Sequence, residues 1–327
     1  MAIDVCSDAI AADGGSSSAV FAGGVGETAM EDIPADVLSL VLRRLDAASL
    51  AALACSCSAF RDLAADDDEL WRCLCLATWP SLRDAAVQHI SDGYRRLFAD
   101  AFPFPAESSP APAAVSLPVK LISAVDLHHD GVLLMSRVVE TDTSSEQFSP
   151  SFRLDALVQE GFTAPSLITP ANLTLSWILI DPDTGRAVNA SSRCPVSVER
   201  SWLNGDTVAR FTVVLAAAGG DGCVALDAAV TCDERHGHVR EVSLRAEDGG
   251  GIGWRDGIAA VVAAMDGARH RGGGAGEEAA RRRYEAFARG RTVRKERKAM
   301  RDGVVDVFFS CVAAAAFVGI LSMLSIR

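Results

Sequence analysis

The segment from residue 31 to residue 79 constrains this chain most, because its apolar residues recur at the spacing of three short helices. Pro34 lacks a backbone N–H group and Asp36 carries a negative charge, and both features favour the start of a helix. Beyond them, large apolar residues follow the period of a helix and form one stripe along it. The residues of this stripe are Val37, Leu38, Val41, Leu42 and Leu45.

Two shorter helical runs follow the first one. The run over residues 47–54 contains Leu50 and Leu53, and the run over residues 57–65 contains Phe60 and Leu63. Helices of two or three turns are marginal in water, so these three depend on packing against each other. A unit of fewer than about fifty residues has too little interior to bury every apolar side chain of the first helix. We therefore expect part of its stripe to bind another protein.

This segment resembles the F-box family. Ile33-Pro34 is similar to the Leu-Pro pair that opens an F-box, and Leu70-Trp71 is similar to the pair that closes it. Phe60 stands where the family usually has Trp, and Ser58 where it usually has Lys. The absence of this Lys affects a charged contact but does not change the expected fold. The other matching positions are the aliphatic pairs Val37-Leu38 and Val41-Leu42, and Leu45-Asp46 at the end of the first helix.

The resemblance implies a recruiting function without chemistry of its own. F-box proteins bind a Skp-type adaptor and bring a target protein to a cullin-based ubiquitin ligase, so we expect a substrate receptor and not an enzyme. We expect no catalytic, cofactor-binding or metal-binding residues. Residues 55–80 further resemble a plant F-box group with a C-terminal hydrophobic tail. The residues expected to bind the adaptor are Ile33, Pro34, Val37, Leu38, Val41, Leu42, Leu45, Leu50, Phe60, Leu70 and Trp71.

The length of 327 residues leaves room for about two domains with linkers. Residues 1–29 are rich in Gly and Ser and lack periodicity, so we expect them to be disordered. The F-box is expected over residues 30–80. Residues 81–101 have helical spacing, and the prolines after them predict a semi-rigid spacer, so residues 81–118 form a helix and a proline-rich linker.

A second domain is expected over residues 119–245, where the apolar period changes to two. Seven such runs, separated by turn signals such as Asn204-Gly205, predict an antiparallel sandwich or a curled sheet. Trp177, Trp202 and Phe211 alternate with polar residues, so we interpret them as core residues. The run Leu-Ser-Trp-Ile-Leu-Ile-Asp-Pro has a faint likeness to the β-sandwich of plant phloem lectins. We expect this domain to select the target.

Two polar clusters contain residue types that bind metal ions. Both coincide with predicted hairpin turns, where solvated Asp, His and Gly are the ordinary composition, so we favour a structural role. The pairs Cys55/Cys57 and Cys73/Cys75 lie on predicted helices, where residues two apart diverge, and we expect them to be packed thiols. The clusters are Asp126, His128, His129 and Asp130, and Asp233, Glu234, His236 and His238.

The net charge of −12 argues against a general nucleic-acid partner. Residues 246–302 are expected to form a glycine-rich linker, with a short helix over residues 254–265, and a basic helix. Residues 277–302 hold ten Lys and Arg against five Asp and Glu. Residues 307–326 then contain no charged residue over 20 positions, and a helix of that length spans a bilayer core of about 30 Å. We expect a tail anchor that keeps the N-terminal body in the cytosol. The alternative is a buried C-terminal helix.

These observations predict an α+β protein with an N-terminal three-helix F-box, an antiparallel β-rich second domain and a C-terminal transmembrane helix. The expected function is the substrate-recognition subunit of a Skp-cullin-F-box ubiquitin ligase, held at a membrane. The alternative is a membrane-anchored β-sandwich binding module of a lectin-like kind, without a ligase role. A hydrolase in the β-rich domain is a third and more distant interpretation, since no nucleophile, phosphate-loop or dinucleotide motif is present.

Overall fold

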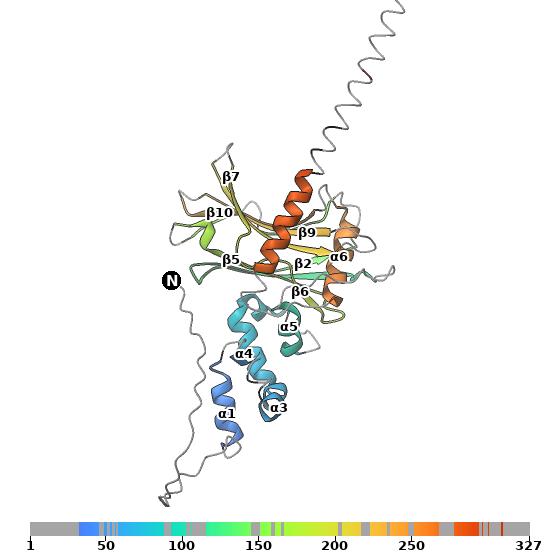
Figure 1. The fold of residues 1–327 in the computed structure, drawn as a ribbon. Helices are drawn as coiled ribbons and strands as arrows, with labels where there is room; N and C mark the ends of the chain where they lie inside the picture. Colours follow the sequence, from blue (N-terminus) through green and yellow to red (C-terminus); the bar gives the residue numbers. More distant parts are fainter. Residues whose placement is uncertain are drawn as a thin grey trace, which may run out of the picture.

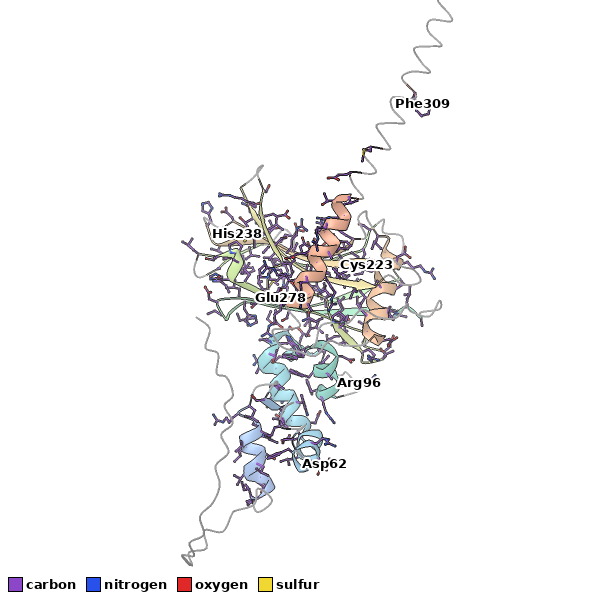
Figure 2. All side chains as sticks on the ribbon, in the orientation of Figure 1. Asp62, Arg96, Cys223, His238, Glu278 and Phe309 are labelled. Carbon is purple, nitrogen blue, oxygen red and sulfur yellow. The ribbon has the colours of Figure 1, made fainter. Side chains whose placement is uncertain are left out.

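The structure is a computed structural model of the full chain. Among the residues that it describes, no helix is both long and apolar enough to cross a membrane. The expectations for residues 1–29 and 307–326 fall outside the described residues, apart from Phe309, which Figure 2 labels. The described residues are 33–45, 49–50, 53, 56, 58–87, 93–102, 105, 116–144, 151–157, 161–164, 167–201, 205–216, 223–233, 236–247, 252–267, 278–293, 296, 300 and 309.

Short helices form the N-terminal part and lie against one face of the β-rich part (Figure 1). The expectation of one helix over residues 81–101 is wrong. The chain forms a 3-10 turn and further turns there, and a new helix begins after Gly93, whose φ of 81° is a conformation that glycine adopts without strain. The helical elements are α1 (Ala35–Leu42), α3 (Ser58–Asp66), α4 (Asp68–Thr78), η2 (Pro80–Arg83) and α5 (Tyr94–Ala101).

The β-rich part consists of two antiparallel sheets, so the predicted α+β class is confirmed. The shorter sheet has the order β2 (Val132–Asp142), β1 (Lys120–His129), β5 (Leu173–Ile180) and β6 (Ala187–Asn189). The longer sheet has the order β3 (Arg153–Leu157), β10 (His238–Glu247), β9 (Cys223–Asp233), β8 (Thr207–Ala216) and β7 (Ser197–Arg200), with β4 (Phe162–Thr163) paired to β10. A 3-10 turn, η3 (Pro170–Asn172), precedes β5.

One continuous core joins the facing sides of the two sheets. Trp177 of β5 and Phe211 of β8 are buried in it, as the alternation of their strands predicts, whereas Trp202 is outside the described residues. The sequence pattern predicts neither β3, β4 nor β6, because two to five residues are too few to establish a period of two. Each of these short strands pairs with a longer one, β3 and β4 with β10 and β6 with β5.

This core continues past residue 245, where the sequence analysis ends the second domain. The helix α6 (Trp254–Asp266) buries Ile258, Val261 and Met265 in the same apolar cluster, so this part of the expected linker belongs to the β-rich fold. Trp254 fixes the start of α6 by donating its indole N–H to the carbonyl of Thr143 at 3.1 Å. The helix expected over residues 254–265 is therefore present, but it packs into the β-rich core and is not part of a linker.

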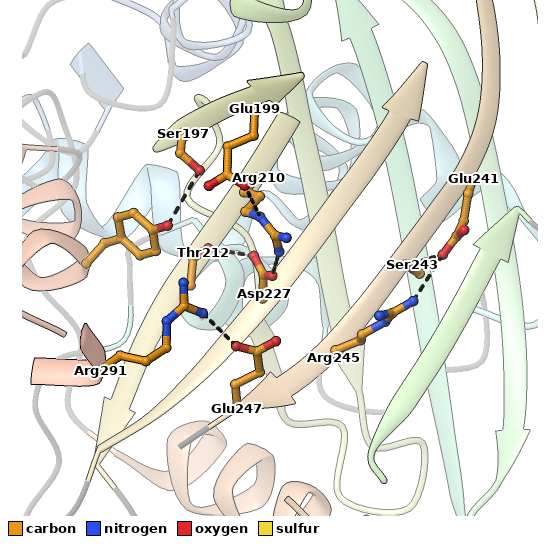
Figure 3. A network of polar contacts seen from close by, with 11 residues as sticks. Ser197, Glu199, Arg210, Thr212, Asp227, Glu241, Ser243, Arg245, Glu247 and Arg291 are labelled. Carbon is orange, nitrogen blue, oxygen red and sulfur yellow. Dashed lines mark hydrogen bonds and ion pairs between the residues drawn. The ribbon is translucent and has the colours of Figure 1, made fainter. Parts of the chain in front are cut away.

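The basic helix over residues 278–293 packs on the outer face of the longer sheet. Phe287 is buried against Val214 and Ala225, and the guanidinium of Arg291 lies 2.8 Å from the carboxylate of Glu247 (Figure 3). The same figure shows a polar network on this outer face, in which Asp227 accepts hydrogen bonds from Arg210 and Thr212. The outer face is therefore largely polar, with one apolar contact for the helix.

Candidate functional site

The first helix of the N-terminal module starts at Pro34. The carbonyl of Pro34 accepts hydrogen bonds from the N–H groups of Val37 and Leu38 at 3.0 and 3.2 Å, and Asp36 lies in the first turn. An acidic residue there interacts favourably with the positive end of the helix dipole. The sequence signals for this helix start are thus confirmed in the structure.

Polar contacts fix the two helices that pack beneath it. Asp67 precedes α4 and accepts a hydrogen bond from the backbone N–H of Leu70 at 2.9 Å, which caps the helix. Trp71 donates its indole N–H to the carbonyl of Ala64 at 2.6 Å and so ties α4 to α3. Arg43 reaches Asp67 at 3.4 Å from the end of α1. These contacts hold α1, α3 and α4 together. Of the helix expected over residues 47–54, only residues 49–50 and 53 are described.

The apolar residues of α1 divide between two sides of the helix. Leu38, Leu42 and Leu45 recur at intervals of four and three residues and face the small core of the module. Val37, Leu40 and Val41 recur at intervals of three and four on another side and are 48%, 65% and 53% exposed. Figure 2 shows this helical module, with Asp62 of α3 at its outer end, extending away from the sheets.

Four of the residues expected to bind an adaptor lie in the interior instead. Leu42 and Leu50 are 1% and 0% exposed, and Phe60 and Leu70 are buried in the same cluster. A side chain in the core cannot contact a partner in this conformation, so these four hold the module together. Leu38, Leu45 and Trp71 pack against this core and are half-buried.

An exposed apolar surface remains on the outer side of α1. Ile33, Pro34, Val37 and Val41 belong to the expected contact residues and are exposed here, and Leu40 joins them although the sequence analysis omits it. Helical spacing could have identified Leu40 as a member of this surface, because residues 37, 40 and 41 lie on one face of a helix. We call Ile33, Pro34, Val37, Leu40 and Val41 the α1 surface.

Comparison with known proteins agrees with this architecture. The F-box-like family model matches residues 30–77. A probable F-box protein of Arabidopsis thaliana is 36% identical over 299 residues, which cover 86% of this chain and 88% of the relative. The chain belongs to the F-box protein family. Two further F-box proteins of Arabidopsis thaliana are 36% identical over 310 residues, covering 84% of each chain, and 32% identical over 317 residues, covering 88% of this chain and 93% of the relative. No solved structure matches the chain.

The similarity to these F-box proteins extends far beyond the F-box, so the β-rich part is shared with them. In this protein the two parts are joined by a second apolar cluster. Trp79, Leu82 and Phe98 from the helices pack against Ile122 and Ile178 on the outer face of the shorter sheet. Arg96, labelled in Figure 2, is on α5 next to this junction. The F-box is therefore attached to the β-rich part by packed side chains.

Buried polar contacts reinforce this junction. Asp126 of β1 is fully buried and accepts hydrogen bonds from the Ser81 backbone N–H at 3.0 Å and from the Ser81 hydroxyl at 2.6 Å. Burial raises the pKa of Asp126, and the hydrogen bonds from Ser81 and Ser136 oppose that rise. This result corrects the sequence-based interpretation of Asp126 as a solvated turn residue.

Arg186 forms the second polar contact of the junction. Its guanidinium lies 2.8 Å from the carboxylate of Asp100 on α5 and 3.3 Å from that of Asp266 at the end of α6, and it also donates to the carbonyl of Met265. One side chain thus joins the helical module, the turn before β6, and α6. No sequence motif predicts this role, because the three partners of Arg186 are 79 to 86 residues away from it in the sequence.

Residues of the two polar clusters weighed as metal sites form hydrogen bonds and ion pairs with neighbouring groups. His129 accepts a hydrogen bond from the Thr169 N–H at 3.0 Å, and Asp130 accepts one from the amide of Asn172 at 2.9 Å. His236 contacts Asp233 at 2.7 Å in an exposed turn, whereas Glu234 is outside the described residues. In the part of the chain that the structure describes, no group of three metal-binding side chains comes together.

The cysteines of α4 point in different directions. Cys73 is exposed, so the expectation of a packed thiol is wrong for this residue, whereas Cys75 is buried and directs its thiol to the carbonyl of Tyr94 at 3.4 Å. Cys55 and Cys57 are outside the described residues. Burial raises the pKa of Cys75 to about 12, with a smaller contribution from Asp68. A thiol with that pKa stays protonated and unreactive at neutral pH, so Cys75 acts as a packed core residue.

Proposed function

We propose that this F-box protein is the substrate-recognition subunit of a Skp-cullin-F-box ubiquitin ligase. The α1 surface is the observation that carries this proposal. It places exposed valine and leucine side chains on a helix whose opposite side is anchored in a core, which is the arrangement that a helical partner requires. The adaptor covers Val37, Leu40 and Val41, and the buried residues beneath keep α1 rigid.

The β-rich part selects the target in this proposal. Its attachment through the packed junction holds a bound target at a fixed position relative to the adaptor. The chain itself contributes binding and positioning, and the bond-forming steps belong to the other subunits of the ligase.

The adaptor contact is tested by capture of a purified Skp-type adaptor and cullin on the full chain. Leu40→Glu places a charge in the middle of the α1 surface and is expected to reduce capture at least tenfold, because an unpaired charge would be buried on binding. Val198→Glu is the matched control, since Val198 is an exposed apolar residue, 45% accessible, on β7 of the β-rich part. Equal capture by both variants and the wild type would exclude the α1 surface.

We further propose that residues 307–326 anchor the protein in a membrane with the body in the cytosol. The support is the sequence: 20 residues without charge follow a basic segment, and only Arg327 comes after them. Replacing Ala315 and Gly319 by Lys adds two charges near the membrane centre, each costing roughly 2.5–3.5 kcal/mol on insertion. Wild-type protein is expected to resist carbonate extraction and the double variant to be extracted. Extraction of the wild type would refute the anchor.

A further inference from the structure

A cavity of about 360 Å³ lies between the first turns of α6 and the end of the β1–β2 pair where Lys120 is opposite Asp142. Its volume falls within the range of about 300–1,000 Å³ that small-molecule sites occupy. The residues that line it belong neither to the α1 surface nor to the apolar cluster of the junction. Because α6 lies beside the sheets and away from α1 (Figure 1), a ligand in this cavity leaves the α1 surface free for an adaptor.

The deep side of this cavity is apolar and held in place from behind. Trp254 and Ile258 are 2% and 1% exposed and belong to the core between the sheets. The indole of Trp254 stacks on the ring of Phe152, with ring centroids 5.2 Å apart, and its N–H group is bonded to the Thr143 carbonyl. Val119 lines the accessible side and is 61% exposed. The cavity therefore offers a preformed apolar wall to a ligand.

The hydroxyl groups in the wall donate their hydrogen bonds within the protein. The Thr143 hydroxyl donates to the carbonyl of Pro118. The Ser144 hydroxyl donates to the carboxylate of Asp142 at 2.6 Å, and the Ser144 backbone N–H donates to the same oxygen at 2.9 Å. These donors are occupied, so they do not select a polar ligand.

Arg255 brings a guanidinium group to the same cavity. It is the second residue of α6 and is exposed, and in the part of the chain that the structure describes no hydrogen bond or salt bridge engages it. The neighbouring Asp256 projects at about 100° from it around the helix axis and does not line the cavity. A guanidinium donates two parallel hydrogen bonds to a carboxylate. The cavity thus fits a ligand with an apolar body and one carboxylate.

We propose that this cavity binds the carboxyl-terminal residue of a target protein, with its apolar side chain against Trp254 and Ile258 and its carboxylate on Arg255. The proposal rests on the proposed role of the β-rich part in target selection. Capture of a terminal carboxylate is a recurring mode of peptide recognition.

The arrangement of the two groups favours a chain end over an internal acidic residue. A terminal residue carries its apolar side chain and its carboxylate on one carbon atom, so a single cavity with a cation at its side receives both. In an extended chain, successive side chains point to opposite faces, so an internal apolar residue and an acidic neighbour do not enter one cavity together.

The test is calorimetric titration of the full chain with a hexapeptide of glycine and serine that ends in leucine. We expect a dissociation constant of about 0.1–1 mM. The same peptide with an amidated end is expected to bind at least tenfold more weakly, because it lacks the negative charge. A peptide with a leucine–aspartate pair inside its sequence and an amidated end is expected to be equally weak.

Arg255→Gln is expected to weaken binding of the free-carboxylate peptide at least tenfold and to remove the difference between the free and amidated peptides. Val119→Glu, which adds a negative charge to the wall, is expected to weaken binding of the free-carboxylate peptide to the same extent. Both residues are exposed, so the melting temperatures are expected to stay within about 2 °C of the wild type. Arg200→Gln changes an exposed arginine on β7, away from the cavity, and is the matched control with unchanged binding.

The proposal is overturned if the leucine peptide does not bind the wild type at up to about 5 mM. It is equally overturned if the amidated or the internal peptide binds as tightly, or if Arg255→Gln binds as the wild type does. Adaptor capture is measured separately on the same chain. Capture of the adaptor without binding of the peptide would overturn this site and leave the ligase function standing, whereas the reverse result would support the site and refute the ligase function.

Discussion

Replacement of Asp126 by Ala tests whether the F-box and the β-rich part are joined by a buried polar contact. The change removes the acceptor for two donors of Ser81, its backbone N–H and its hydroxyl, and Ser81 is itself only 4% exposed. A buried donor left without an acceptor costs about 1–3 kcal/mol, so the two together predict a loss of about 2–5 kcal/mol in the free energy of unfolding.

Asp126→Asn is the matched variant. Its Oδ1 atom still accepts the hydrogen bond from the Ser81 N–H, and its amide N–H donates to the Ser81 hydroxyl, so we expect a loss of no more than about 1–2 kcal/mol. Asn keeps the size and shape of Asp, whereas Ala also leaves a small cavity at this buried position. The difference between the two variants therefore measures the hydrogen bonds together with the packing of the lost group.

The pH dependence of stability gives a second measure of the same contact. Because burial raises the pKa of Asp126 in the folded protein, the folded state binds a proton more tightly than the unfolded state. The contribution of Asp126 to stability thus falls as the pH rises from about 4, the unfolded pKa, through the folded pKa. Asp126→Asn is expected to remove this part of the pH dependence.

Urea unfolding of the full chain, followed by tryptophan fluorescence at several pH values, measures these quantities. Trp79 lies in the junction cluster and reports on its opening. If Asp126→Ala unfolds at the same urea concentration and with the same slope as the wild type, Ser81 does not depend on Asp126 and the reasoning fails.

Two further predictions concern the junction and the core. Arg186→Met leaves the buried carboxylate of Asp100 without its cation and is expected to cost about 3–5 kcal/mol in urea unfolding, whereas a loss below 1 kcal/mol would contradict it. Gly257→Ala places a methyl group 2.5 Å from a buried phenylalanine ring and is expected to cost about 1–3 kcal/mol, whereas Gly253→Ala meets nothing closer than 3.8 Å and is the control; equal melting temperatures would refute the clash.

The sequence predicts the elements that long periodic runs define. The helical spacing around Val37 and Leu42 and the alternation around Trp177 each extend over enough residues to identify a helix or a strand. The sequence does not show which side of α1 is exposed and which is buried, because both sides are apolar. The packing of the helices beneath α1 decides which side faces the core. The burial of Leu42 and the exposure of Leu40 are settled by that packing.

The junction is beyond prediction from the sequence for a related reason. Asp126 and Arg186 are ordinary polar residues beside turn-like sequences, and their partners lie 45 and up to 86 residues away. Burial of Asp126 follows from the placement of η2 over β1, which no local pattern encodes.

The affinity of the full chain for a purified Skp-type adaptor tests the central claim most directly. Val37 and Val41 are about half exposed, so their burial on binding contributes roughly 1.5–3 kcal/mol together. The variant with both residues changed to Glu is expected to bind about 10- to 150-fold more weakly by calorimetric titration, while Val198→Glu binds as the wild type does. Unchanged affinity of the folded double variant would contradict the assignment of α1 as the adaptor-binding surface.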